Sequence, residues 1–176
     1  TQSTFEVAQQ KNLLMDSKLT LFSQIISKID RVIFKKIVKE KKTDYRNKGF
    51  DSWTHLVSML FCHFAKSTSV RDISNGLRSA TGNLNHLGIK TAPSKSSISY
   101  QNGKRDADLF KDVYFKLLEQ LGQHTKERRI KLKIKVPVYL LDSTLISLCL
   151  SLFDWATYRT KKGAVKMHTL LEYDGK

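Results

Sequence analysis

The chain has 176 residues, a length that suits one domain or two small ones. Its formal net charge of +15 favours a polyanionic partner such as DNA or RNA, because phosphate neutralisation releases condensed counterions; an anionic membrane surface is the competing explanation. No apolar run approaches the ~20 residues that span a bilayer, and the first twenty residues lack a secretory signal, so we expect a cytoplasmic protein. Neither Cys62 nor Cys149 has a Cys or His at metal-ligand spacing, which indicates small core residues.

Helical periodicity dominates the first part of the chain. Apolar residues recur at helical spacing over residues 21–33, which predicts one amphipathic helix, and a lysine-rich stretch and a loop at 43–50 follow. Asp51 or Ser52 is a suitable cap for a second helix. The predicted buried face of that helix contains Trp53, Leu56, Val57, Leu60, Phe61 and Phe64.

Further helices are predicted from caps and spacing. A capping-box sequence predicts a third helix over residues 69–79, and the Gly, Asn and Pro residues within 80–93 indicate a loop. A polar helical stretch over 95–105 follows, and apolar residues then recur at helical spacing over 110–121. We therefore predict a helical, DNA-binding domain over residues 1–125.

The character of the chain changes after this domain. Residues 126–135 are rich in Lys and Arg, which predicts a basic linker. Residues 138–148 are apolar on both parities, as in a strand covered on both faces, and 163–173 is a second strand candidate. Asp174-Gly175 is a hairpin-turn signal with no returning strand after it. We predict the start of an α/β domain, cut short, over residues 136–176.

Asp142 is the first candidate for chemistry, because it stands among apolar residues of the first predicted strand. A carboxylate in such a place is costly to bury unless something pairs with it, and a divalent metal is one such partner. The alternative is an Asp at a strand end that caps a turn made with Ser143 and Thr144. The pattern alone favours this second interpretation.

Short motifs follow one another in a definite order along the chain. In the second half they are Leu141–Thr144, Leu148–Ala156, Arg159 and Lys162–Leu171. In the first half they are Phe50–Leu56, Val70–Ile73, Asn85–Ile89 and Ser96–Ser99, with Asn102 and Arg105. Their order and spacing resemble insertion-sequence-four-like DDE transposases, with the helical domain of that family followed by the start of its catalytic domain.

This resemblance implies a mostly α-helical amino-terminal domain followed by the first strands of an α/β RNase H-like domain, truncated here. Asp142 occupies the position of the first acid of the Asp-Asp-Glu triad, as a catalytic residue and metal ligand. The triad holds two Mg²⁺ ions that activate the attacking oxygen and stabilise the leaving oxygen. The implied function is a DNA transposase of an insertion sequence, which binds the element ends and, in its full-length form, cleaves and transfers DNA strands.

The other acids after Asp142 are Asp154, Glu172 and Asp174, and all lie too close to it to be the second Asp of the family. The triad is therefore expected to be incomplete within these 176 residues, and we predict that the chain alone does not cut DNA. Family members act as assemblies on DNA. A homodimer on the terminal inverted repeats is compatible with the sequence, which shows no dimer surface.

The polar helix over residues 95–105 is the main candidate for contact with double-stranded DNA. A helix-turn-helix motif would place it in the major groove, although the gap from Ser79 to Ser94 is longer than the usual turn. A short extra helix at Leu84–Leu87 or a looser arrangement accommodates the gap, and an exposed polar face without a ligand explains the same pattern. The candidate contacts are Lys95, Ser96, Ser97, Ser99, Gln101, Asn102, Lys104 and Arg105.

Basic residues outside this helix have two interpretations each, as phosphate contacts or as solvated surface. In the linker they are Lys131 and Lys133, and between the predicted strands they are Arg159, Lys161 and Lys162. Lys166 and His168 share a strand parity and belong to the family-like motif, which allows phosphate contact near the metal site. Most aromatic residues have core spacing, so the sequence predicts no stacking platform for single strands.

Three hypotheses account for the basic charge. The first is the DNA-binding and first-acid portion of a DDE transposase. The second is a stand-alone sequence-specific DNA-binding module or an inactive transposase remnant, and the third is an RNA-associated or ribosome-associated protein. The first two alone explain the apolar strand that carries Asp142 and the ordered motifs.

Overall fold

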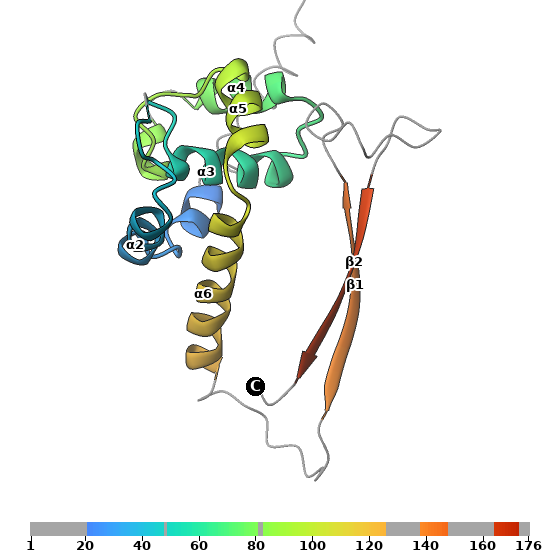
Figure 1. The fold of residues 1–176 in the computed structure, drawn as a ribbon. Coiled ribbons are helices and arrows are strands. Elements are labelled where there is room, and N and C mark those ends of the chain that lie inside the picture. The colour runs from blue at the N-terminus through green and yellow to red at the C-terminus, as the bar shows by residue number, and fades with distance from the viewer. Residues whose placement is uncertain (1–20, 48, 81–82, 126–137, 148–163, 173–176) are drawn as a thin grey trace, which may run out of the picture. The chain divides into compact units, whose positions relative to one another are not determined.

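The computed structural model describes residues 21–47, 49–80, 83–125, 138–147 and 164–172. The chain is mostly helical and ends in two antiparallel strands, as predicted (Figure 1). Contacts divide it into two compact units, Thr1–Asp106 and Ala107–Lys176. The elements are α2 (Arg31–Lys41), α3 (Ser52–Phe64), α4 (Val70–Ser79), the 3-10 helix η1 (Leu84–Leu87), α5 (Lys95–Lys104), α6 (Asp108–Thr125), β1 (Tyr139–Ser147) and β2 (Ala164–Glu172).

The single helix predicted over residues 21–33 is wrong, because the chain turns before α2 begins. Residues 21–26 are helical, and a new helix then starts after Asp30. The Asp30 carboxylate accepts hydrogen bonds from the backbone N–H of Val32 at 2.7 Å and of Ile33 at 3.2 Å. These bonds satisfy N–H groups that a continuous helix would have used internally. The apolar residues at helical spacing over 21–33 therefore belong to two successive helices rather than to one.

The predicted caps of the next helices are confirmed. The Asp51 side chain accepts from Thr54 N at 2.8 Å and begins α3, and Ser69 accepts from Asp72 N at 3.1 Å and begins α4. The short helix predicted between Ser79 and Ser94 is also present, as η1. Cap chemistry is local, which explains why it could be predicted from neighbouring residues.

Trp53 is the centre of the core that α2, α3 and η1 share. Its ring meets Phe34 edge-on at 5.1 Å between centroids, and the Arg31 guanidinium lies 4.2 Å from the Trp53 ring centroid. Its indole Nε1 donates to the Leu87 carbonyl at 2.8 Å, and Arg31 donates to the Gly88 carbonyl at 3.0 Å. These contacts anchor the connection between α4 and α5 to α2 and α3.

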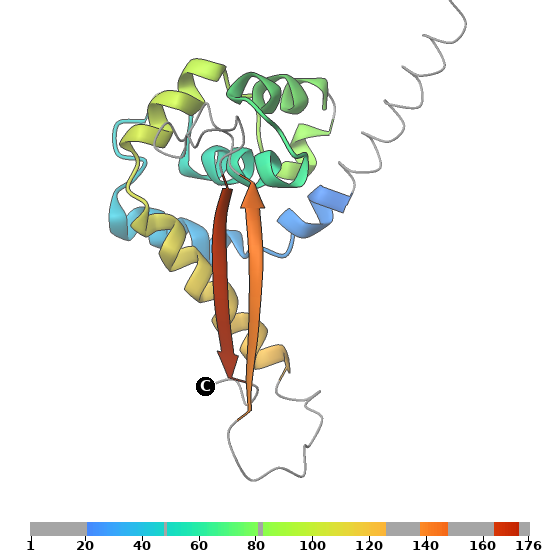
Figure 2. The ribbon, with the colours of Figure 1, turned by 90° about the vertical axis from the view of Figure 1, so that its right-hand side faces the viewer.

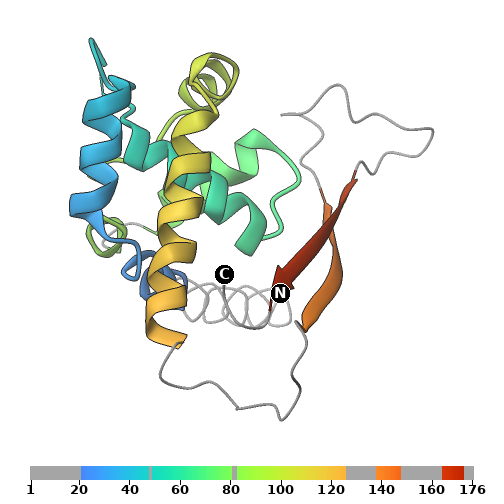
Figure 3. The ribbon, with the colours of Figure 1, turned by 60° about the horizontal axis from the view of Figure 1, so that its bottom comes forward.

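Helices α3, α4 and α5 contact one another in pairs (Figures 1 and 3). The fully buried side chains that fill the space between them include Val57, Ile73, Leu77 and Ile98. The arrangement gives a compact trihelical core, in which the long connection through η1 replaces the short turn of a standard helix-turn-helix motif.

The strands β1 and β2 pair antiparallel from Tyr139↔Glu172 to Ser147↔Ala164, which confirms the two predicted strands (Figure 2). The predicted covering of both faces is not observed in the described residues. Leu141 is 74% exposed on one face, and Leu140 and Met167 are exposed on the other. The turn predicted at Asp174-Gly175 lies outside the described residues.

Two glycines make a matched test of the fold. Gly88 has φ +68°, and a Cβ there would collide with the Arg31 guanidinium, whereas a Cβ on Gly103 would meet open space. We expect Gly88→Ala to lower the free energy of unfolding by about 1–3 kcal/mol, since the left-handed conformation alone costs roughly 1–2 kcal/mol for a residue with a Cβ. Gly103→Ala, within α5, should raise it by about 0.5–1 kcal/mol. Urea unfolding measures both, and a loss of similar size at the two sites would contradict this account.

Candidate nucleic-acid interface

Helix α5 is held firmly at its beginning. Ser94 caps it by accepting a hydrogen bond from Ser97 N at 3.1 Å, and Ser74 on α4 donates to the carbonyl of the preceding Pro93 at 2.8 Å. Within α5, all of which the structure describes, Ile98 is the one buried side chain. A single anchor therefore leaves most of the helix surface to solvent. Lys95, Ser96, Ser99 and Lys104 are all exposed.

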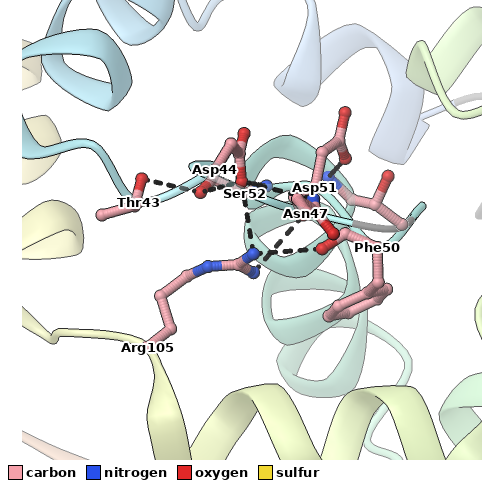
Figure 4. A network of polar contacts seen from close by, with 8 residues as sticks. Thr43, Asp44, Asn47, Phe50, Asp51, Ser52 and Arg105 are labelled. Atoms are coloured by element: carbon pink, nitrogen blue, oxygen red, sulfur yellow. Dashed lines mark hydrogen bonds and ion pairs between the residues drawn. The ribbon is translucent and has the colours of Figure 1, made fainter.

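Arg105, directly after α5, has its side chain inside the protein rather than on the helix surface. The side chain is 2% exposed, and its guanidinium donates to the carbonyls of Phe50 at 3.0 Å and Asp51 at 3.4 Å (Figure 4). It also pairs with the Asp44 carboxylate at 3.3 Å. Burial lowers the pKa of Arg105, and Asp44 and Asp51 oppose this effect. The Arg105 guanidinium is therefore not available for the predicted contact with DNA.

The Asp44 carboxylate connects this pair to the start of α3. Its Oδ1 atom accepts from both the backbone N–H and the hydroxyl of Ser52 at 2.8 Å, and Thr43 Oγ1 lies 2.9 Å from Ser52 Oγ. A neutralised carboxylate with several donors is a stable arrangement when it is partly buried. The loop before α3 and the end of α5 thus share one polar network.

His55 on α3 is a buried polar residue that the sequence analysis did not single out. Its ring is 5.5 Å from the Phe50 ring. Burial and the nearby charge of Arg105 lower the pKa of His55 to about 4, and a hydrogen bond with Asn102 opposes this shift. Asn102 therefore also faces the protein interior with at least part of its side chain, which reduces its availability for bases. Gln101 is half-buried.

The register of the β1–β2 hairpin determines on which face each predicted site residue of the second unit lies. Asp142 pairs with Thr169, whereas His168 pairs with Ser143 and Lys166 pairs with Leu145. Directly paired residues share a face of the ladder, and successive residues alternate between faces. Lys166 and His168 therefore lie on the face opposite to Asp142. Of the two interpretations of Lys166 and His168, the register therefore does not favour phosphate contact beside the Asp142 carboxylate.

Asp142 is exposed, and the Thr144 hydroxyl donates to its carboxylate at 3.4 Å. Across the residues that the structure describes, no group of three or more His, Cys, Asp or Glu side chains is placed to hold a metal ion. Two Mg²⁺ ions need several oxygen ligands between them. The described part of the chain thus does not fit a two-magnesium centre.

Several predicted contacts lie outside the described residues, namely Lys131, Lys133, Arg159, Lys161 and Lys162. In the described segments, no helix is long and apolar enough to cross a membrane.

Comparison with known proteins gives one match. The family model of the domain of unknown function DUF4372 matches residues 17–90, which is less than half of the chain, and this domain is found in transposase-like proteins. The matched segment contains α2, α3, α4 and η1 and stops before α5. No curated protein and no solved structure matches the chain.

Arg105 and its neighbour Lys104 provide a test of the polar network. Arg105→Met leaves the partly buried Asp44 carboxylate without its cation, so we expect the free energy of unfolding to fall by about 2–4 kcal/mol. Lys104→Met removes an exposed charge and should change it by less than about 0.5 kcal/mol. Urea unfolding followed by circular dichroism measures both. Equal effects of the two substitutions would show that Arg105 does not hold the fold together.

The buried His55 predicts a pH dependence of stability. Because its pKa is about 4 in the folded chain and near 6.5 in the unfolded chain, the unfolded chain binds an extra proton between these values. Stability present above about pH 6.5 should therefore fall by about 3 kcal/mol as the pH drops to about 4. Histidine NMR signals titrated with pH give the midpoint directly, and His55→Gln should flatten the dependence. A midpoint near 6.5 for His55 would refute the prediction.

Proposed function

We propose that this chain belongs to the insertion-sequence-four-like DDE transposases and carries the first acid of their triad, and that its helical unit, Thr1–Asp106, binds double-stranded DNA at the element ends through α5. The ordered motifs support the family, and the match of residues 17–90 to a domain found in transposase-like proteins agrees with it. The net charge of +15 supports a polyanionic partner. The exposed polar surface of α5 is the observation that carries the DNA-binding part.

The dimensions and support of α5 suit a recognition helix. An α-helix with its side chains is about 10–12 Å across, which matches a major groove about 12 Å wide, and the ten residues of α5 give it a length of about 15 Å along the groove. Recognition also needs a helix that does not shift, because base contacts depend on position. The Ser94 cap, the Ser74–Pro93 hydrogen bond, buried Ile98 and the Arg105 network hold α5 from one end to the other.

The exposed residues divide into two roles. Lys95 and Lys104, near opposite ends of α5, supply positive charge for phosphates on either side of the groove. Ser96 and Ser99 lie closer to the amino-terminal end, which contacts base edges in helix-turn-helix proteins. Gln101, half-buried, presents an amide that can pair with adenine.

We also propose that Asp142 is the first acid of the catalytic triad, on the resemblance of its strand motif to the family. Its carboxylate is accessible on β1, as a metal ligand must be. Together with further acidic ligands, bound Mg²⁺ would supply activation of the attacking oxygen. A DNA-binding module without cleavage activity is the alternative. The duplex-binding role of α5 is common to both.

The duplex-binding proposal is tested with single lysine substitutions. Lys95→Ala and Lys104→Ala should each weaken binding to duplex DNA from the element ends and reduce the slope of log K against log salt by about 0.9 per lost phosphate contact. The matched control is Lys116→Ala, because Lys116 is an exposed helical lysine on α6, paired with Glu119 at 2.7 Å. Fluorescence anisotropy over a salt series measures these constants.

Ser96→Ala adds a test of sequence reading, since loss of a base contact should narrow the difference between element ends and unrelated duplex by about 1–3 kcal/mol. The proposal fails if the α5 lysine variants bind as tightly as Lys116→Ala. Equal affinity for structured RNA and for element ends would favour the RNA-associated alternative.

A further inference from the structure

A pocket of about 570 Å³ lies in the helical unit, between the turn that follows α2 and the last turn of α5. Pockets for small ligands commonly have volumes of about 300–1,000 Å³. Residues from two distant parts of the sequence line it, among them Lys41, Tyr45, Arg46, Tyr100, Gln101 and Lys104. No stacking platform was predicted, because most aromatic residues have core spacing; Tyr45 and Tyr100, which are far apart in the sequence, both line this pocket in the fold.

Two tyrosines on this pocket have most of their surface open to solvent. Tyr45 is 72% exposed and Tyr100 is 61% exposed. Each has a cation beside it, because Arg46 Cζ lies 5.2 Å from the Tyr45 centroid and Lys104 Nζ lies 5.3 Å from the Tyr100 centroid. The Lys104 ammonium also donates to the Tyr100 hydroxyl at 3.1 Å. The pocket thus contains two aromatic rings, each paired with a positive charge.

The partly buried Asp44–Arg105 ion pair holds the two sides of this pocket in place. Asp44 precedes Tyr45 and fixes the turn, while Arg105 follows Lys104 and fixes the end of α5. The Tyr45 N–H donates to the Lys42 carbonyl at 3.0 Å, which closes the turn further. A ligand would therefore meet rings on a supported backbone, which lowers the entropy lost on binding.

An unpaired nucleotide has the chemistry that this pocket can recognise. A base stacks on a tyrosine ring while its phosphate meets the neighbouring cation, and the Gln101 amide can donate to or accept from the base edge. Lys41, Arg46 and Lys104 outnumber Asp106 among the charged lining residues apart from the paired Arg105, so the pocket favours an anion. Bases inside a duplex have both faces covered by their neighbours and cannot stack in this way.

We propose that this pocket binds an unpaired nucleotide of single-stranded DNA, with the base on Tyr45 or Tyr100 and the phosphate at Arg46 or Lys104. This binding mode shares Gln101 and Lys104 with the duplex contact proposed for α5, and it adds Tyr45, Arg46 and Tyr100. Single-stranded DNA would then have its own determinants, and Tyr45 lies outside α5 altogether.

The test compares two fluorescent strands on the full chain by anisotropy. One is an oligothymidylate of about ten nucleotides, within the site sizes of single-strand binders, and the other is an abasic strand of equal length and charge. Wild-type chain should bind oligothymidylate at least about 5-fold more tightly, because stacking contributes substantially per base. Equal binding of the two strands would overturn the proposal and leave phosphate contact alone. This comparison requires no substitution and holds whether or not a variant folds.

Substitutions then locate the stacking residues. Tyr45→Leu and Tyr100→Leu should each weaken oligothymidylate binding by about 5- to 100-fold, while Tyr45→Phe and Tyr100→Phe keep the ring and should stay within about 2-fold of wild type. The control is Tyr114→Leu on α6, a tyrosine of similar exposure. Leucine variants that bind oligothymidylate like the control would refute the pocket. Duplex affinity of Tyr45→Leu should not change, so failure here is distinguishable from failure of the α5 proposal.

Discussion

The ion pair between the buried Arg105 side chain and the partly buried Asp44 carboxylate is the interaction on which the helical unit depends. Arg105 follows α5, and its guanidinium reaches the Asp44 carboxylate and the carbonyls that precede α3. A guanidinium stays charged when buried, because several acceptors in its plane replace water. One side chain thereby fixes the start of one helix and the end of another. This contact therefore positions both the exposed face of α5 and the pocket beside Tyr100.

This constraint also shows why total charge is a poor guide to which side chains are available to a polyanionic partner. Lys104 and Arg105 are neighbours in the sequence, yet Lys104 is exposed and Arg105 has its side chain in the interior. Their substitutions should therefore separate two properties, affinity for phosphate and stability of the fold. Lys fits the exposed position because an ammonium is strongly hydrated, whereas the planar Arg fork suits a site with several fixed acceptors.

Prediction from the sequence succeeded where the deciding groups are close in the chain. The caps at Asp51 and Ser69 each involve a side chain and an N–H group three residues apart, so neighbouring residues were enough to predict them. The break at Asp30 was missed because apolar periodicity continues across it. Other features depend on residues that are far apart in the sequence, and no local pattern contains that information. They are the interior position of Arg105, the shared pocket of Tyr45 and Tyr100, and the strand register.

The hairpin and the helical unit support the proposed function to different degrees, for a physical reason. Two strands with apolar side chains exposed on both faces, such as Leu141 and Leu140, are marginally stable alone, and a single Asp142 carboxylate holds no pair of metal ions. A catalytic role for Asp142 thus needs covering layers and further ligands. Duplex binding by α5 needs neither, because its caps and core lie within the helical unit. The binding experiments therefore test the role of α5 independently of whether Asp142 is catalytic.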